Sequence, residues 1–396
     1  MPRVYVEFSR VAGVFAPLAY LGAVIACLAL VGCDPRGTKP TPVTATSSGG
    51  NAVVTNPDAL PPNDEILRQI DDALDYTYEH RRLSVKEQAA WQIIHGALAF
   101  KRDFKVSDGQ KDVSAVDYVL QGGQMRGWNL VRGELLDGKT MRYGVRALLE
   151  EGTKTGQGHA DQWMGYLSDC GLPLDEPIFV AGKQHTLRDY LEQIERDVHL
   201  NLIREYSWTL MALTAYRPTD HQWKAGDGSE WSIPKMVEIE LEHSLDSSPC
   251  GGTHRMTALT MAYNRHVANG GKVEGVWEKL KGKIIACIEM AEKNQNPDGS
   301  LSSNYFARPG KTGDLTLAMG SGGHVMEFLT VALDKEELQQ PWVKRAVLDV
   351  CKLFRKTKPV DVECGALFHA AHGLVLYREK VFGPRTFGKG EVAASE

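Results

Sequence analysis

Three histidines that recur in one short pattern are the side chains of this chain best suited to chemistry. Each follows a run of small residues, and each is followed five positions later by a leucine. They are His254, His324 and His369. Imidazole is a general acid or base near neutral pH and a common metal ligand. The pattern predicts a histidine-lined site, with the alternative that these histidines only cap turns and pack by repeat symmetry.

Three weaker copies extend the series along the chain. The full set of repeat positions is Gln92, His159, Trp208, His254, His324 and His369. Most consecutive positions are separated by roughly 40–50 residues, the length of one helical hairpin, and two longer gaps leave room for insertions. Apolar residues follow these positions at helical spacing. We therefore predict an all-α fold, an (α/α)6 toroid of six helical hairpins over residues 64–380.

The predicted toroid has an inner and an outer ring of helices. Inner helices are expected near 86–101, 159–170, 203–216, 252–268, 321–333 and 365–379. Outer amphipathic helices are expected near 64–82, 141–151, 186–200, 234–245, 274–294 and 340–356. The repeat positions should then lie at the N-terminal ends of the inner helices, at one mouth of a central cavity. Exposed backbone amides at such ends favour anionic ligands.

Side chains one helical turn below the repeat positions add a carboxylate and further imidazoles. The predicted catalytic set is His254, His324, His369, Glu327 and His372. In this set a histidine is the general base, and Glu327 orients it or donates a proton. The predicted substrate contacts are Gln92, His95, His159, Trp208 and Tyr206. No metal ligands are assigned and no cofactor is expected, although neighbouring inner helices would allow two or three histidines to share a zinc ion.

Five cysteines lie beyond the N-terminal region. They are Cys170, Cys250, Cys287, Cys351 and Cys364. An odd number does not describe a complete disulfide framework. Cys250 and Cys364 come shortly before repeat positions, so a cysteine nucleophile beside a histidine is an open alternative.

The N-terminus has the pattern of an export signal. Arg3 and Arg10 precede an apolar run, and Leu30-Val31-Gly32-Cys33 resembles the lipobox of bacterial lipoproteins, in which the cysteine is acylated. A transmembrane anchor is the alternative. Residues 34–63, rich in Pro, Thr and Ser, predict a disordered linker, and 381–396 a flexible tail. These features predict a location in the cell envelope, lipid-anchored through Cys33 on the extracytoplasmic side of a membrane.

One turn carries a family resemblance. Residues Gln295-Asn-Pro-Asp298-Gly299-Ser300 resemble the Gln-x-x-Asp-Gly turn of the squalene-cyclase and protein-prenyltransferase superfamily. The resemblance implies an α/α toroid whose inner helices line a cavity. It does not extend to the chemistry, because the cyclase Asp-x-Asp-Asp acid is absent. Asp71-Asp72-Ala-Leu-Asp75 matches a diphosphate-binding motif but falls on the first outer helix. The whole chain also resembles a group of bacterial lipoproteins.

Two main functions follow from these features. The first is an exported enzyme that acts on a glycan or a lipid-like substrate in the cavity. The second is a non-catalytic surface protein that binds a ligand or a partner, and an isoprenoid cyclase or transferase comes third. A net charge of −5 without a basic stripe argues against a nucleic-acid partner. Histidines close to carboxylates would favour the enzyme, and histidines held by backbone carbonyls would favour simple packing.

Overall fold

The computed structural model describes residues 60–388. The predicted export signal with its lipidation site Cys33, nearly all of the predicted linker and residues 389–396 lie outside the described residues. Within residues 60–388, none of the helices combines the length and the hydropathy needed to span a bilayer.

The described part of the chain is mostly helical, with about 53% of the structure in helices and several small sheets. The even-numbered α-helices are α2 (Ala90–Phe100), α4 (Gln162–Asp169), α6 (Ser207–Tyr216), α8 (Thr253–Ala268), α10 (Leu315–Ala332) and α12 (Cys364–Phe382). The odd-numbered α-helices are α1 (Asn63–His80), α3 (Ala115–Leu120), α5 (Leu187–Asp197), α7 (Ile233–Glu242), α9 (Val276–Lys293) and α11 (Pro341–Thr357). The helix order therefore follows the predicted one except between α2 and α4.

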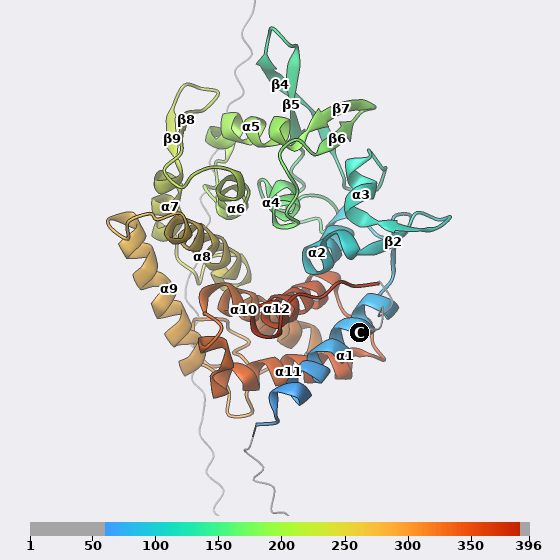
Figure 1. Ribbon diagram of the computed structural model, residues 1–396, viewed down its shortest axis with the longest axis vertical. Coiled ribbons are helices and arrows are strands. Elements are labelled where there is room, and N and C mark those ends of the chain that lie inside the picture. Colours follow the sequence, from blue (N-terminus) through green and yellow to red (C-terminus); the bar gives the residue numbers. More distant parts are fainter. Residues whose placement is uncertain (1–59, 389–396) are drawn as a thin grey trace, which may run out of the picture. The chain divides into compact units, whose positions relative to one another are not determined.

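The even-numbered helices form a closed circuit of contacts. Each packs against the next even-numbered helix, and α12 packs against α2. In Figure 1 these helices surround a common centre, and the odd-numbered helices lie outside them. The first helix, α1, packs against α11 and α12 at the other end of the chain. Apolar side chains on one face of α1, including Ile66, Ile70 and Leu74, are fully buried in that contact region.

Residues 60–388 also form four small sheets, so the prediction of an all-α fold is incomplete. The first sheet has three strands, β1 (Leu83–Ser84), β2 (Lys105–Ser107) and β3 (Asp112–Ser114). The others are antiparallel pairs, β4 (Leu130–Asp137) with β5 (Arg142–Ala147), β6 (Pro177–Val180) with β7 (Lys183–Thr186), and β8 (Gln222–Lys224) with β9 (Glu230–Ser232). All of these strands lie in connections between helices, so they leave the circuit of even-numbered helices intact.

The predicted outer helix at 141–151 is wrong, because residues 142–147 form strand β5. Packing against α5 explains why these residues form a strand. A Cβ at Gly144 would lie 2.9 Å from Cβ of Gln193 on α5, so only glycine fits there. Arg142 and Arg146 then bond carboxylates of the same helix, Asp189 at 2.8 Å and Asp197 at 2.5 Å. The helix outside α2 and α4 is instead the short α3, which the sequence analysis missed.

The Gln295–Ser300 turn depends on its glycine. Gly299 adopts a φ of +87°, which favours glycine. The Gln295 amide donates hydrogen bonds to the carbonyls of Gly299 and Trp342, and Trp342 lies in the first turn of α11. The turn therefore ties the end of α9 to the start of α11.

The small residues before His324 are not a turn. Gly322 and Gly323 lie inside α10, and His324 is well within that helix rather than at its N-terminal end. A Cβ at Gly323 would lie 2.6 Å from the backbone of Ala370, so glycine allows α10 and α12 to approach closely. By contrast, Gly251 and Gly252 have φ values of +61° and +74° and do form a turn before α8. The predicted ring of helix N-termini at one mouth is therefore wrong for α10.

Gly323→Ala is expected to lower the free energy of unfolding by about 1–3 kcal/mol, the cost of overpacking a close contact. The neighbouring Gly322→Ala is the matched control, because nothing lies within 4 Å of its added Cβ. Alanine is the better helix former by up to about 1 kcal/mol, so the control should be neutral or stabilising. Urea unfolding of both variants tests this, and equal stabilities would contradict the close approach of α10 and α12.

Candidate functional site

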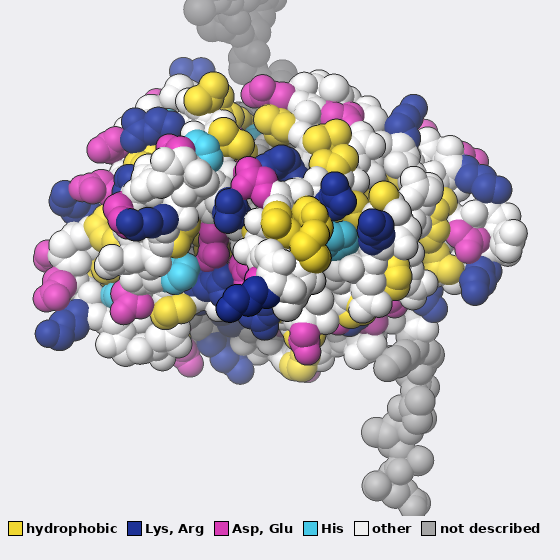
Figure 2. Space-filling model, turned by 90° about the horizontal axis from the view of Figure 1, so that it is seen from above, with side chains coloured by type: hydrophobic (Ala, Val, Ile, Leu, Met, Phe, Trp, Pro, Cys, Tyr) yellow, Lys and Arg dark blue, Asp and Glu magenta, His cyan; other side chains and the backbone are white. Residues whose placement is uncertain are grey.

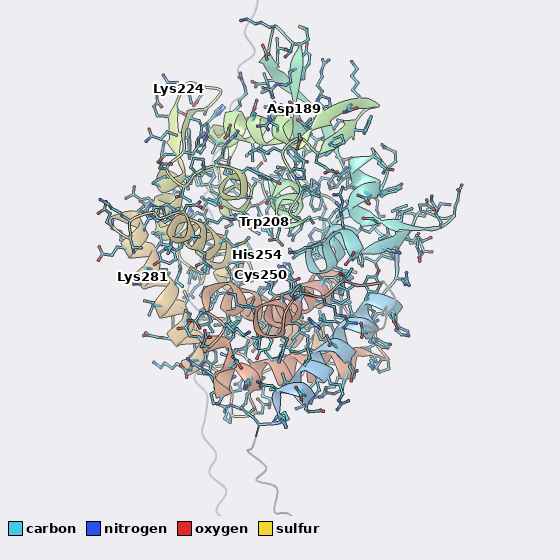
Figure 3. The ribbon with its side chains drawn as sticks, viewed as in Figure 1. Asp189, Trp208, Lys224, Cys250, His254 and Lys281 are labelled. Atoms are coloured by element: carbon cyan, nitrogen blue, oxygen red, sulfur yellow. The ribbon has the colours of Figure 1, made fainter. Side chains whose placement is uncertain are left out.

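A cavity of about 410 Å³ lies between the even-numbered helices. Its lining includes Trp91, His95, Lys154, His159, Gln162, Cys250, His254, Tyr305, Asp314, His324, Glu363 and His369. They come from α2, α4, α8, α10 and α12, and from the connections that precede α4, α8, α10 and α12. Figure 3 shows Trp208, His254 and Cys250 near the centre that these helices surround. Helices far apart in the sequence thus converge on one group of imidazoles.

Glu327 is the hub of this group. Its carboxylate is buried and accepts hydrogen bonds from Nδ1 of His372 at 2.7 Å, of His369 at 2.9 Å and of His324 at 3.2 Å. A carboxylate only accepts hydrogen bonds, so each facing Nδ1 carries the proton. Burial opposes ionisation of Glu327, but the hydrogen bonds that His324, His369 and His372 donate to it hold its pKa well below the ordinary value. The side chain is therefore an anion inside the protein.

His372 connects Glu327 to a second carboxylate. Its Nε2 lies 3.6 Å from Oδ2 of Asp169, at the end of α4. Burial lowers the pKa of His372, but the two carboxylates outweigh burial and raise that pKa to about 9. His372 is thus a buried cation between two anions, and it lies behind the cavity rather than on its lining.

His369 has the opposite electrostatic character. Burial lowers its pKa to about 3, even though Glu327 acts in the other direction. The imidazole is therefore neutral. With Nδ1 bonded to Glu327, its Nε2 carries the lone pair, and the side chain lines the cavity. A neutral imidazole with a fixed tautomer is able to accept a proton from a molecule in the cavity.

Cys250 is the site residue to which the sequence analysis gave least weight. It lies in the turn before α8 with a φ of +50°, and it faces His324. Burial alone would raise the pKa of the thiol, but His324 lowers it below the ordinary value. Burial likewise opposes protonation of His324, but Cys250 and Glu327 raise the pKa of His324 to about 10. The pattern Cys-Gly-Gly-Thr-His was the available signal, and only the fold shows that the thiol turns toward a second helix.

His254 stands apart because both ring nitrogens are buried without a hydrogen-bond partner among residues 60–388. Its ring centroid lies 4.6 Å from that of His324 and 5.3 Å from that of His369. Burial, followed by the charge of His324, holds the pKa of His254 well below its ordinary value. An unpartnered buried imidazole is costly, so a missing partner needs an explanation.

The predicted catalytic residues therefore lie together, and the histidines differ in what holds them. His324, His369 and His372 bond a carboxylate. By contrast, Nδ1 of His95 faces the backbone carbonyl of Trp91 at 2.5 Å, and burial lowers the pKa of His95 to about 4. His95 matches the packing interpretation best, while its Nε2 lies 3.2 Å from the hydroxyl of Tyr166.

Three of the predicted substrate contacts border the central cavity region. His95 and His159 line the cavity, and His159 is paired with Glu205 at 2.9 Å. Trp208 is buried, with its ring centroid 5.3 Å from that of His254 and 4.6 Å from that of Tyr166. Trp208 is therefore a wall behind the histidines rather than an exposed stacking platform.

The other two predicted contacts are in different places. Gln92 accepts a hydrogen bond from the backbone N–H of Ala89 at the start of its own helix, and its neighbour Trp91 lines the cavity instead. Tyr206 packs against Trp231 and lines a different pocket. Proximity to Trp208 in sequence therefore does not place Tyr206 at the central cavity.

The diphosphate-like motif does not belong to the cavity. Asp71 bonds Arg378 at 2.8 Å, and Asp75 bonds Arg385 at 2.5 Å. These ion pairs fasten α1 to α12 and to the segment that follows it. Neither aspartate is among the residues that line the central cavity.

A second pocket, of about 440 Å³, has an apolar lining. It includes Leu148, Leu149, Leu200, Leu202 and Ile203, and these five side chains are also strongly exposed. Figure 2, which views the face with α5 and the β-hairpins, shows apolar side chains in separate patches among charges of both signs. Exposed apolar side chains beside an apolar pocket are typical of a binding surface.

A third pocket lies between the first two. Glu151 and Ile203 line both it and the apolar pocket, while Trp91, Lys154 and His159 line both it and the central cavity. The three pockets are therefore neighbours along one side of the helices. We call these three neighbouring pockets the connected pockets.

No protein-family model, no curated protein and no solved structure matches this chain. The function is therefore inferred from the site itself.

Proposed function

We propose that this chain is an (α/α)6 toroid enzyme that hydrolyses an ester or amide bond in a lipid-like substrate. The observation that carries the proposal is one buried carboxylate, Glu327, bonded to three histidines beside a cavity. The circuit of even-numbered helices with odd-numbered helices outside supports the toroid. Buried titratable groups with opposed pKa shifts are characteristic of acid–base sites.

In this mechanism His369 is the general base. It takes a proton from water through Nε2, and the resulting hydroxide adds to the substrate carbonyl carbon. The bond from that carbon to the leaving group then breaks, and His369 returns the proton to the leaving group. Glu327 holds the Nδ1–H of His369 and stabilises the imidazolium that forms between the two proton transfers. His372 and Asp169 hold Glu327 from behind.

The connected pockets support a lipid-like substrate over a glycan. An amphiphile with its reactive group at His369 would extend past His159 and Ile203 into the apolar pocket. Leucine and isoleucine side chains make up much of the lining of that pocket, beside Tyr190, Tyr206 and several polar residues, and an apolar lining of this kind suits an alkyl chain. Membrane tethering through an acylated Cys33, as the sequence predicts, would keep the enzyme near such substrates, and it forms part of the proposal.

His369→Asn is expected to lower kcat/KM for a carboxylic ester by about 10²–10⁴-fold, the usual contribution of a general base. The test uses chromogenic esters of increasing acyl length, and kcat/KM should rise with length. His221→Asn is the matched control, because His221 is also paired with a glutamate, Glu195 at 3.0 Å, but outside the cavity. A wild-type protein that binds long-chain amphiphiles without hydrolysing any ester or amide would instead support the non-catalytic binding protein.

A further inference from the structure

We propose that Cys250, His254 and His324 form a binding site for a divalent transition metal ion, with zinc the best match. The proposal rests on the proposed function in one respect, because the ion would lie in the same cavity as His369. One nitrogen of each histidine and the thiol sulfur all lie within 4.8 Å of one another. Ligand atoms of a tetrahedral zinc site lie roughly 3.5 Å apart at the usual bond lengths, so small side-chain movements would complete the site.

The hydrogen bonds around these residues leave the correct atoms free. Glu327 accepts the proton of His324 Nδ1, so Nε2 remains as the ligand atom. A carboxylate that fixes the tautomer of a ligating histidine is the usual outer partner in zinc sites. Within the part of the chain that the structure describes, neither buried ring nitrogen of His254 has a hydrogen-bond partner, so an ion would satisfy one of them.

The chemistry of the three ligands selects the ion. A thiolate with two imidazoles suits zinc and its neighbours in the transition series, whereas magnesium and calcium need oxygen ligands. The thiolate and the Glu327 carboxylate together balance a double positive charge.

Three protein ligands are the number found in catalytic zinc sites, which keep a fourth position open. All three proposed ligands line the central cavity, as does His369. The open position would therefore face the substrate space. His369 remains outside the ligand set, because the group of ligand atoms within 4.8 Å of one another that includes Cys250 contains His254 and His324 but not His369.

The test is metal binding by the purified full chain, measured without reference to activity. We expect one equivalent of zinc by mass spectrometry, and Co²⁺ added to the metal-free protein should give a sulfur-to-cobalt charge-transfer band. Cys250→Ser should abolish that band and weaken zinc binding at least 100-fold, and His254→Ala should weaken binding similarly. Cys364→Ser is the matched control, because Cys364 is a free, half-buried cysteine that does not line the cavity. Thermal unfolding of the metal-free variants verifies that each is folded.

Glu327→Gln should keep the charge-transfer band while weakening zinc binding about 10–100-fold, the usual effect of losing an outer partner. Absence of both zinc and the cobalt band in the wild-type protein would overturn the metal site. A band that persists in Cys250→Ser would overturn it as well. Neither result depends on ester hydrolysis, so the proposed acid–base function fails or stands separately.

Discussion

Glu327→Gln is expected to lower kcat/KM for the best ester substrate by about 10²–10⁴-fold. Glutamine keeps the size of the side chain but removes the charge that stabilises an imidazolium at His369. Only one of its terminal atoms is able to accept hydrogen bonds, while three Nδ1–H groups require an acceptor. The loss should appear mainly in kcat, because the carboxylate acts on the histidine that reacts and not on the substrate.

The stability of this variant is measured beside its turnover. Glutamine leaves the buried cation His372 with one anion fewer and leaves Nδ1–H groups without an acceptor, so the fold should lose stability as well. We expect the melting temperature of Glu327→Gln to fall, and turnover to fall by the full factor at a temperature where the variant is still folded. Glu195→Gln is the control, since Glu195 also bonds a histidine and an arginine but lies outside the cavity. Wild-type turnover in Glu327→Gln would refute the role of Glu327.

Glu240→Leu is expected to lower the free energy of unfolding by about 3–5 kcal/mol. Glu240 bonds Arg255 at 2.7 Å, with both side chains buried. It also accepts hydrogen bonds from the backbone of Tyr206 at 2.6 Å and the hydroxyl of Ser207 at 3.0 Å. One carboxylate thus joins α6, α7 and α8. Its removal leaves a guanidinium buried without its counter-ion, which is the costly outcome.

The ion pair as a whole should contribute much less to the free energy of unfolding than the loss caused by removing one partner suggests. Burial raises the pKa of Glu240, against the lowering effect of Arg255, so desolvation outweighs the attraction. The double variant Glu240→Leu/Arg255→Met is therefore expected to be more stable than Glu240→Leu alone in urea unfolding. The exposed pair Glu65–Arg68, at a similar 2.6 Å, serves as the control, and Arg68→Ala should leave stability unchanged. Equal free energies of unfolding for Glu240→Leu and Glu240→Leu/Arg255→Met would contradict this explanation.

The sequence predicted the helices well, because their apolar faces repeat at the helical period over many residues. It failed at residues 142–147, where Gly144, together with Gly133 of the paired strand β4, packs against Gln193 in a contact that no local pattern reports. The same limit explains why the turn predicted at Gly322 and Gly323 is wrong. Two adjacent glycines predict a turn, but here Gly323 provides room for the backbone of α12 inside a continuous helix.

The candidate site was predictable where the repeat carried it and not elsewhere. His254, His324 and His369 recur in one pattern, and Glu327 and His372 follow one turn later, so they were found together. Asp169 was not predicted, because it lies at the end of α4, at a spacing from the repeat that carries no signal in the sequence. Cys250 was noted as a cysteine before a repeat position, but its approach to His324 on α10 depends on the fold. Which nitrogen each histidine presents also depends on its neighbours in three dimensions.

The measurement that tests the central claim most directly is a crystal structure of the protein with a long-chain alkyl phosphonate, a stable analogue of the ester-hydrolysis intermediate. The account predicts the phosphonate oxygens within hydrogen-bond distance of His369 Nε2. It also predicts the alkyl chain along His159 and Ile203 toward the apolar pocket. A phosphonate bound elsewhere, or a head group away from His369 and Glu327, would contradict the claim that this cavity holds the reacting bond of a lipid-like substrate.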